Sequence, residues 1–174
     1  MNTVLLGALA VLSVLNLMAT GMVLKRSWGT ARRDRVAGEY PPPHLAHLIG
    51  HEPSEFVATG VDDREIATAD LHNRPWLLGF FSTGCAPCHE RAPEFAALAR
   101  ETPDSIAVVT GGGAERNDLV GLLDGSSIVL VDAAAATVVR AFGIDAFPTL
   151  VQTQDGRILQ AGVAVEHLRS LSST

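Results

Sequence analysis

The longest apolar run of the chain lies near its N-terminus. Residues 3–24 carry no charged side chain, and only four uncharged polar residues interrupt a run of Leu, Val, Ala, Met and Gly. As a helix this run would be about 33 Å long, roughly the thickness of a bilayer's hydrocarbon core. A cleaved signal peptide opens with basic residues, and none precedes the run. The pattern therefore predicts a retained transmembrane helix, residues 1–24.

A basic and proline-rich segment, residues 25–49, follows this run. Its five Lys and Arg residues all lie before position 36, and Pro41, Pro42 and Pro43 stand in a row. Proline-rich chains favour an extended conformation. The segment is therefore predicted to be a semi-rigid linker between the membrane and a folded domain, residues 50–174.

Within residues 50–174, short apolar runs predict the strands of a sheet. The run Trp76–Phe81 has no polar alternation, which is typical of a strand that is buried on both faces. Residues 67–73 predict a turn. Further strands are predicted at residues 55–61, 106–109, 128–131, 147–153 and 157–163, the last two joined by the turn Asp155-Gly156.

Helices are predicted between several of these strands. After the second cysteine, an apolar face recurs at helical spacing, and Pro93 is expected to bend the axis; the face consists of Ala92, Phe95, Ala96 and Ala99. Residues 114–123 and 133–142 predict two more helices, the second capped by Asp132 and ended by Gly143, and a short helix closes the chain. Strands that alternate with helices before a final hairpin indicate an α/β fold, a mixed central sheet flanked by helices.

Charge separates the predicted domain from the linker. Residues 50–174 hold eight basic and 17 acidic side chains, a net charge of −9, whereas residues 25–49 have a net charge of +3. Nucleic-acid binding requires Lys and Arg to neutralise phosphates, so an acidic domain without a basic stripe argues against that function. Five basic residues directly after the apolar run, and none before it, place the domain in the cytoplasm by the positive-inside rule.

Cys85 and Cys88 are the only cysteines of the chain. They lie where the strand at 76–81 ends and a helix begins. A disulfide between residues three apart closes too short a loop to stabilise a fold much, so a removable, redox-active pair is the better interpretation. The positive end of the helix dipole favours the Cys85 thiolate. The pair therefore predicts thiol–disulfide chemistry.

Several motifs stand in a fixed order over residues 50–174. They are Gly50-His-Glu-Pro53-Ser-Glu-Phe56, Cys85-Ala-Pro-Cys88, Pro93, and Phe142-Gly-Ile-Asp-Ala-Phe147-Pro148-Thr149 followed by Asp155-Gly156. Together they resemble the membrane-anchored, TlpA-like branch of the thioredoxin superfamily, which includes the cytochrome c maturation reductases and the methylamine-utilisation protein MauD. An N-terminal anchor before such a domain is most similar to MauD. The resemblance implies a thioredoxin-like fold.

The resemblance also implies roles for individual residues. Cys85 is the attacking thiol and Cys88 the resolving thiol, while Pro148 is a cis-proline facing the disulfide and the backbone of Phe147 pairs with an extended substrate. A cis peptide bond has a low free-energy cost only when it precedes proline. The implied activity is that of a protein thiol–disulfide oxidoreductase, which acts on protein thiols and disulfides and exchanges electrons with a redox donor or acceptor protein. We expect a monomer without cofactor or metal, and the family places such domains outside the membrane.

Three positions depart from these relatives. Thioredoxins carry a buried aspartate six residues before the first cysteine, where this chain has Gly79. Some TlpA-like reductases carry a glutamate three residues after the second cysteine, where this chain has Arg91. The usual proton carrier for Cys88 is therefore missing from both places. Gly84 stands where a tryptophan often precedes the first cysteine, which opens the surface around the Cys85 sulfur.

The residues after the second cysteine are candidates for tuning the site. His89 and Glu90 could carry the proton of the resolving thiol. His89 and Arg91 could lower the pKa of Cys85 from the free-cysteine value of about 8.5, as the helix N-terminus does. Ala86-Pro87 between the cysteines is closer to the Gly-Pro of reductases than to the Pro-His of strong oxidants. A disulfide reductase is therefore the expected function.

Three other functions are alternatives to disulfide reduction. A peroxiredoxin would need a proline seven residues before its reactive cysteine, where Leu78 stands. A copper chaperone could use Cys85, Cys88 and His89 because thiolates are soft ligands, although Cys-x-x-Cys closes readily to a disulfide. An assembly factor could hold a partner in the groove beside Pro148 without redox chemistry.

Overall fold

The computed structural model describes residues 41–169 of the 174-residue chain. The predicted transmembrane helix, residues 1–24, and most of the predicted linker lie outside this range and stay predictions. Within residues 41–169, no helix combines the length and the apolar composition that crossing a bilayer requires.

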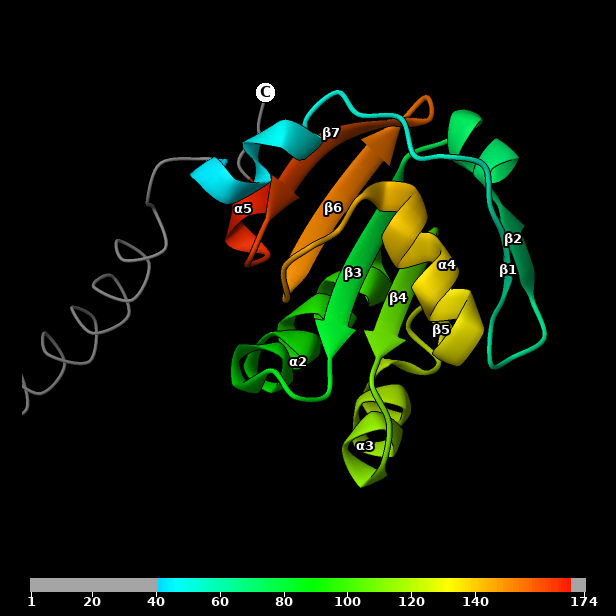
Figure 1. The fold of residues 1–174 in the computed structure, drawn as a ribbon, viewed down its shortest axis with the longest axis vertical. Helices are drawn as coiled ribbons and strands as arrows, with labels where there is room; N and C mark the ends of the chain where they lie inside the picture. The colour runs from blue at the N-terminus through cyan, green and yellow to red at the C-terminus, as the bar shows by residue number, and fades with distance from the viewer. Residues whose placement is uncertain (1–40, 170–174) are drawn as a thin grey trace, which may run out of the picture. The chain divides into compact units, whose positions relative to one another are not determined.

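A five-stranded mixed sheet organises the described residues (Figure 1). In spatial order its strands are β5 (Ile128–Leu130), β4 (Ser105–Thr110), β3 (Trp76–Ser82), β6 (Thr149–Gln154) and β7 (Arg157–Gly162). β3, β4 and β5 are parallel, whereas β6 is antiparallel to β3 and β7 is antiparallel to β6. As predicted, β3 is buried on both faces, and β6 and β7 form a hairpin.

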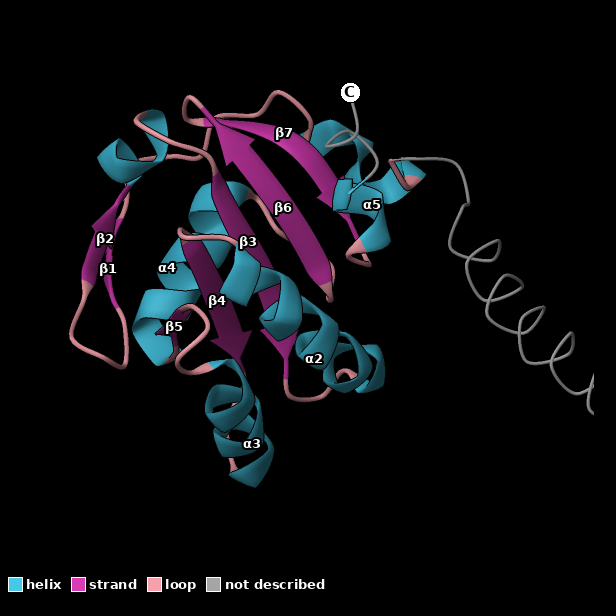
Figure 2. Ribbon diagram, turned by 180° about the vertical axis from the view of Figure 1, so that it is seen from behind, coloured by secondary structure: helices cyan, strands magenta, loops and turns pink. Residues whose placement is uncertain are grey.

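Helices cover both faces of this sheet, as the sequence predicts (Figures 1 and 2). α4 (Asp132–Phe142) lies on one face and α2 (Ala86–Glu101) lies on the other. α2 continues through Pro93 without interruption. α3 (Ala114–Leu123) contacts α2 and β4, and the short α5 (Glu166–Arg169) packs against β6 and β7.

Two apolar cores result, one on each face of the sheet. Alternate residues of β3 divide between them, with Leu78 and Phe80 in one core and Leu77 and Phe81 in the other. The α4-side core also contains residues of α4, of η1 (Pro43–Leu48) and of the hairpin formed by β1 (Val57–Thr59) and β2 (Glu65–Ala67). The α2-side core contains Cys88 and the buried faces of α2, α3 and α5.

A small antiparallel hairpin precedes β3. Its first strand, β1 (Val57–Thr59), lies within the strand predicted at 55–61, whereas the sequence pattern does not predict its partner, β2 (Glu65–Ala67). Three residues with a single buried side chain make too short a run to be recognised. The 3-10 helix η2 (Thr68–His72) occupies the predicted turn. The Val61 N–H donates to the carbonyl of Val129, so the hairpin adjoins the edge strand β5.

Residues 43–48 correct the expectation of an extended linker. Pro43–Leu48 form a 3-10 helix, η1, whose Leu45 and Leu48 are each 1% exposed in the α4-side core. Proline is tolerated at a helix start because its φ suits a helix and its missing N–H would lack a partner there. Burial of the two leucines favours docking. The folded unit therefore begins before Gly50, the boundary expected from the sequence.

The start of α4 corrects a second expectation, because Asp132 is not its cap. Val131 occupies the N-cap position, and Asp132 is the first helical residue, with a φ of +50°. The Asp132 carboxylate instead accepts a hydrogen bond from Arg116 of α3 at 2.8 Å. The end of α4 agrees with the prediction, since Gly143 adopts the left-handed conformation with a φ of +66°.

Candidate active site

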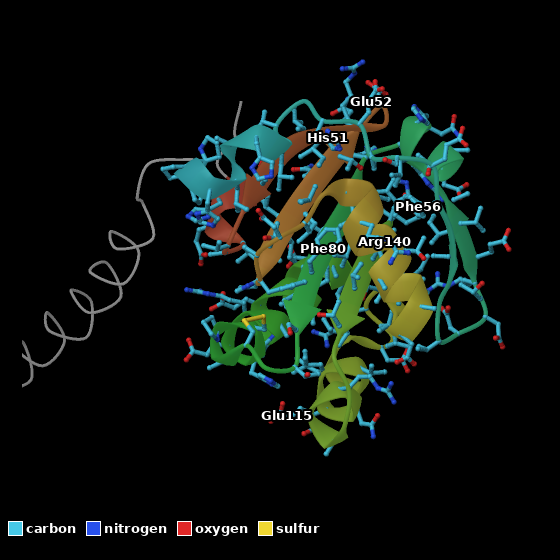
Figure 3. The ribbon with its side chains drawn as sticks, viewed as in Figure 1. His51, Glu52, Phe56, Phe80, Glu115 and Arg140 are labelled. Atoms are coloured by element: carbon cyan, nitrogen blue, oxygen red, sulfur yellow. A yellow bond between two sulfur atoms is a disulfide. The ribbon has the colours of Figure 1, made fainter. Side chains whose placement is uncertain are left out.

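The two cysteines lie at the start of α2, just after the carboxyl end of β3. Cys85 is the N-cap residue of α2, and Cys88 lies in its first turn. Their sulfurs form a disulfide, with the two Cα atoms 5.3 Å apart. Figure 3 shows the disulfide as a yellow bond at α2. The positive end of the α2 dipole thus lies beside the pair, which favours a thiolate there.

The two sulfurs differ in their access to a partner. Cys88 is 0% exposed and belongs to the α2-side core, whereas Cys85 is partly exposed. Exchange begins when a thiolate reaches a disulfide sulfur, so in this arrangement Cys85 is the one that another protein can approach. The geometry fits Cys85 as the attacking thiol and Cys88 as the resolving thiol, and these roles stay predictions.

The loop before β6 faces the disulfide. The Phe147–Pro148 peptide bond is cis, as predicted, and Pro148 is buried. The Cys85 Sγ atom lies 3.4 Å from the carbonyl oxygen of Phe147. Residues 85 and 147, far apart in the sequence, therefore meet at one surface. Binding of substrate backbone at Phe147 and Pro148 remains a prediction.

Ser82 and Thr83, which precede Cys85, both contact the site, and neither was predicted from the sequence. The Ser82 N–H donates to the Cys88 Sγ atom at 3.4 Å. The Thr83 carbonyl lies 3.1 Å from His89 Nε2, and a carbonyl only accepts, so Nε2 carries the proton. The Thr83 N–H in turn donates to Thr110 O at 3.1 Å. No pattern signal marks these contacts, because they run through backbone atoms.

Glycines shape the surface around this loop. A side chain at Gly84 would meet no atom within 4 Å, so the surface next to Cys85 is open, as expected. Gly111 has a φ of +94°, and a Cβ atom there would lie 2.1 Å from the Thr83 hydroxyl oxygen. The loop after β4 therefore packs directly on the loop that carries Cys85.

Of the three candidate tuning residues, only His89 contacts the loop before the cysteines. Arg91 pairs with Glu94, with 2.8 Å between Nη1 and Oε2. Glu90 is exposed. Among the contacts recorded for the described residues, neither Glu90 nor Arg91 reaches a cysteine sulfur. The structure thus does not bring these two side chains into the site.

The position of the missing buried carboxylate is filled by aromatic rings. A Cβ atom at Gly79 would lie 2.7 Å from Cε2 of Phe81 and 2.8 Å from Cε2 of Phe95. These two rings pack edge to face with 5.5 Å between centroids, and both are 0% exposed. The space that relatives give to a carboxylate is therefore apolar and closed in this protein.

Metal binding finds no support in this arrangement. In the part of the chain that the structure describes, no three His, Cys, Asp or Glu side chains lie close enough together to hold an ion. Cys85 and Cys88 are joined in a disulfide here, so copper binding by the reduced pair with His89 stays a prediction. His89 Nε2 is directed to the Thr83 carbonyl.

A cleft of about 550 Å³ lies apart from the disulfide, beside the start of β3. Its lining includes Arg74, Trp76, Arg100 and Asp104. Arg74 pairs with Asp104 at 3.1 Å and lies over the Trp76 ring at 5.1 Å. These contacts join the segment before β3 to the segment before β4.

Comparison with known proteins identifies the architecture. No protein-family model matches the sequence, and no curated protein does. Solved structures match well. The thioredoxin domain of a thiol-disulfide oxidoreductase from Bacteroides vulgatus superposes with a TM-score of 0.55 at 16% identity, covering 69% of this chain and 91% of that one. The chain has a thioredoxin-like fold.

Two further solved structures share this thioredoxin-like fold. The exposed lipoprotein thioredoxin Etrx1 of Streptococcus pneumoniae has a TM-score of 0.50 at 23% identity, over 62% of this chain and 87% of its own. A secreted disulfide oxidoreductase of Mycobacterium tuberculosis has a TM-score of 0.50 at 21% identity, over 59% and 79%. At these identities the likeness establishes the fold, which confirms the α/β expectation for residues 50–169.

Proposed function

We propose that this chain is a membrane-tethered protein thiol–disulfide oxidoreductase that works as a disulfide reductase. One observation carries the proposal. The Cys85–Cys88 disulfide lies at the N-terminus of α2, with the Cys85 sulfur 3.4 Å from the carbonyl oxygen of Phe147 and beside Pro148. Solved structures with the same fold are named as oxidoreductases of this kind, which supports the same activity.

In the reducing direction, the Cys85 thiolate attacks one sulfur of a partner's disulfide. A bond forms between Cys85 and that sulfur, the partner's disulfide breaks, and the electron pair leaves on its second sulfur, which takes a proton from water. The Cys88 thiolate then attacks the Cys85 sulfur, re-forms the Cys85–Cys88 disulfide and releases a dithiol. Two electrons pass to the partner, and a redox donor protein must return them before the next turnover.

Two features support the reducing direction. Strong stabilisation of the reduced form makes such a couple more oxidising. Here Arg91 is paired with Glu94 and His89 is bonded to Thr83, so the helix N-terminus is left as the main stabiliser of a Cys85 thiolate. The second feature is Ala86-Pro87, which resembles the Gly-Pro dipeptide of reductases more than the Pro-His of strong oxidants.

A trapping experiment tests the activity. With insulin as a model protein disulfide, the full chain in detergent should reduce the substrate when a small thiol recycles it. Cys88→Ser should stop turnover and accumulate a covalent complex that a reducing agent releases, because the resolving sulfur is gone. Cys85→Ser is the matched control and should form no complex, since Cys88 is buried. Absence of both turnover and trapped complex would refute the proposal.

The tether is part of the proposal and rests on residues 3–24. The side of the membrane has two opposed arguments. The basic residues after the apolar run point to the cytoplasm, whereas related folds occur in an exposed lipoprotein and in a secreted protein. Reporters that are active only inside or only outside the cell, fused after Thr174, decide between them. Recovery of the full chain in the soluble fraction of lysed cells would refute the tether.

A further inference from the structure

Among residues 41–169, no acidic or basic side chain is seen in contact with the Cys88 sulfur, so none is placed to accept its proton. In the exchange reaction Cys88 must lose that proton before its sulfur can attack Cys85. The four strands that contribute to the α2-side core, β3, β4, β5 and β6, carry no Asp, Glu, His, Lys or Arg side chain along their length. Cys88 itself is 0% exposed.

The helices around Cys88 offer charged groups, but these are directed elsewhere. On α2, His89 holds its Nε2 proton toward Thr83 O, Arg91 pairs with Glu94, and Glu90 is exposed. On α5, His167 Nδ1 accepts from the Val163 N–H, and Glu166 is exposed. The charged side chains of α3 lie on its outer side, since its buried residues are Leu119 and Leu123.

Phe95 helps to fill the place from which a carboxylate at position 79 would project into the α2-side core. Its ring lies 2.8 Å from the place of a Gly79 Cβ atom, and Phe81 lies 2.7 Å from it. Not even a methyl group fits there, and the lining is apolar, so an ordered water has neither room nor partners. The polar neighbour recorded for the Cys88 sulfur is the Ser82 N–H, which is a donor and takes no proton.

We propose that this protein resolves its mixed disulfide without an internal base: Cys88 gives its proton to hydroxide or buffer from the solvent on the Cys85 side. The rings of Phe95 and Phe81 fill the space in which a carboxylate at position 79 would stand. This inference rests on the proposed function and concerns its regulation. Resolution is then controlled by pH. At low pH the partner stays covalently attached to Cys85, and at high pH it is released quickly.

The reaction balances as follows. Hydroxide takes the Cys88 proton and forms water, and the Cys88 thiolate attacks the Cys85 sulfur. The bond between Cys85 and the partner sulfur breaks, and the electron pair leaves on the partner as a thiolate. The Cys85–Cys88 pair is oxidised by two electrons, and the partner has been reduced by two over the full sequence.

The aromatic disulfide dithiobis(nitrobenzoate) separates the two steps. Attack by Cys85 releases one coloured thiolate at a rate proportional to reagent concentration, and resolution by Cys88 releases the second at a rate independent of it. The leaving thiolate is weakly basic and needs no proton, so the second phase reports deprotonation of Cys88. The fully reduced chain in detergent is mixed with the reagent between about pH 5.5 and 7.5, below the ordinary thiol pKa of about 8.5.

In the wild type, the rate of the second phase should rise about tenfold per pH unit over this range, because the thiolate fraction does so at pH values below the thiol pKa. The double variant Gly79→Asp/Phe95→Ala exchanges the ring for a carboxylate in the vacated space. It should resolve on the order of 100-fold faster at the acidic end, with a flattened profile, as expected for a positioned base. Gly79→Asn/Phe95→Ala is the matched control and should keep the wild-type slope.

Several outcomes would overturn the inference. A wild-type second phase that does not change with pH would show that an internal base exists. In that case, a tenfold rise per pH unit in His89→Gln would identify His89 as that base. An equal gain in the Asn control would show that space rather than a base is limiting. If the Asp variant fails to fold, as judged by circular dichroism, the wild-type profile and His89→Gln still decide. Absence of any second phase refutes the proposed function instead.

Discussion

The two faces of the central sheet are packed by different kinds of side chain. The α4-side core is built from large rings and leucines, and its Phe142 ring lies 5.5 Å from Phe80 and 6.0 Å from Phe56. The α2-side core holds the rings of Phe81 and Phe95 together with a set of small residues between helix and sheet: Gly79 and Ala107 on the strands, and Ala92, Ala96 and Ala99 on α2. Only the second core contains a cysteine.

This difference separates stability from chemistry. Large side chains bury much apolar area and tolerate some rearrangement, so the α4-side core supplies stability without touching the disulfide. Small residues let a helix lie close to a sheet, and that closeness fixes where the helix N-terminus and Cys88 sit. A change on the α2 side should therefore alter the reaction as well as the free energy of unfolding.

The largest effect is expected from Phe142→Ala in the α4-side core. The variant removes a ring with 0% exposure that contacts two others, so the free energy of unfolding should fall by about 3–5 kcal/mol. Denaturant unfolding measures this loss. The rate of insulin reduction per folded molecule should stay at the wild-type level. A lower rate in fully folded protein would mean that this core also shapes the site.

Gly79→Ala should have a smaller effect on stability and a larger one on the reaction. Its Cβ atom would approach Phe81 and Phe95 to 2.7 and 2.8 Å, and such overpacking costs about 1–3 kcal/mol. Displacement of these rings should also change the rate of the second phase with the aromatic disulfide, which stopped-flow absorbance records.

Gly121→Ala provides the matched control for that change. Gly121 lies in α3, where a Cβ atom would meet nothing within 4 Å. Alanine forms a helix more readily than glycine, so this variant should gain about 0.5–1 kcal/mol and keep wild-type kinetics. If Gly79→Ala matched Gly121→Ala in stability and in kinetics, the α2-side core would not be tightly packed at Gly79.

The smallest effect is expected at the turn of the β1–β2 hairpin, and it depends on pH. Burial raises the pKa of Asp62, but hydrogen bonds and the charge of Arg64 outweigh burial and hold this pKa below its ordinary value of 3.8. A lowered carboxyl pKa stabilises the folded state at pH values above the ordinary pKa. This contribution is lost as the pH falls through the folded-state pKa. Arg64 is 61% exposed, so the contribution is below about 1 kcal/mol.

Thermal unfolding of the wild type and of Asp62→Asn tests this contribution of the Asp62 carboxylate to stability. The difference between them should be constant from neutral pH to about pH 5 and should vanish below the ordinary carboxyl range. A difference that grows on acidification would contradict the assignment, because it has the opposite sign.

The sequence predicted the elements whose signal is periodic or continuous. Trp76–Phe81 is apolar at every position because both faces of β3 are covered, and the spacing of Ala92, Phe95 and Ala99 shows one face of α2. The cysteine pair was predicted because its chemistry depends on residue type and spacing, whereas the prediction for Pro148 came from the resemblance to thioredoxin-like proteins. Such signals can be recognised without knowledge of the tertiary structure.

Other features depend on contacts that no local pattern contains. η1 forms because Leu45 and Leu48 find a core built by residues far along the chain, and composition alone suggested an extended segment. The sequence showed that a carboxylate is absent at Gly79. It did not show that Phe95, 16 positions later, occupies the space, since that requires the distance between a helix and a strand.

The hydrogen bonds at the two margins of the sheet have a consequence for solubility. Gly50 and His51 pair with Ile158 on the outer side of β7, and Val61 donates to Val129 on the outer side of β5. An open strand edge is a template for another chain and a common start of aggregation. Both margins of this five-stranded sheet are partly occupied by the chain itself, so copies held close together at high local concentration are hindered from joining strand to strand.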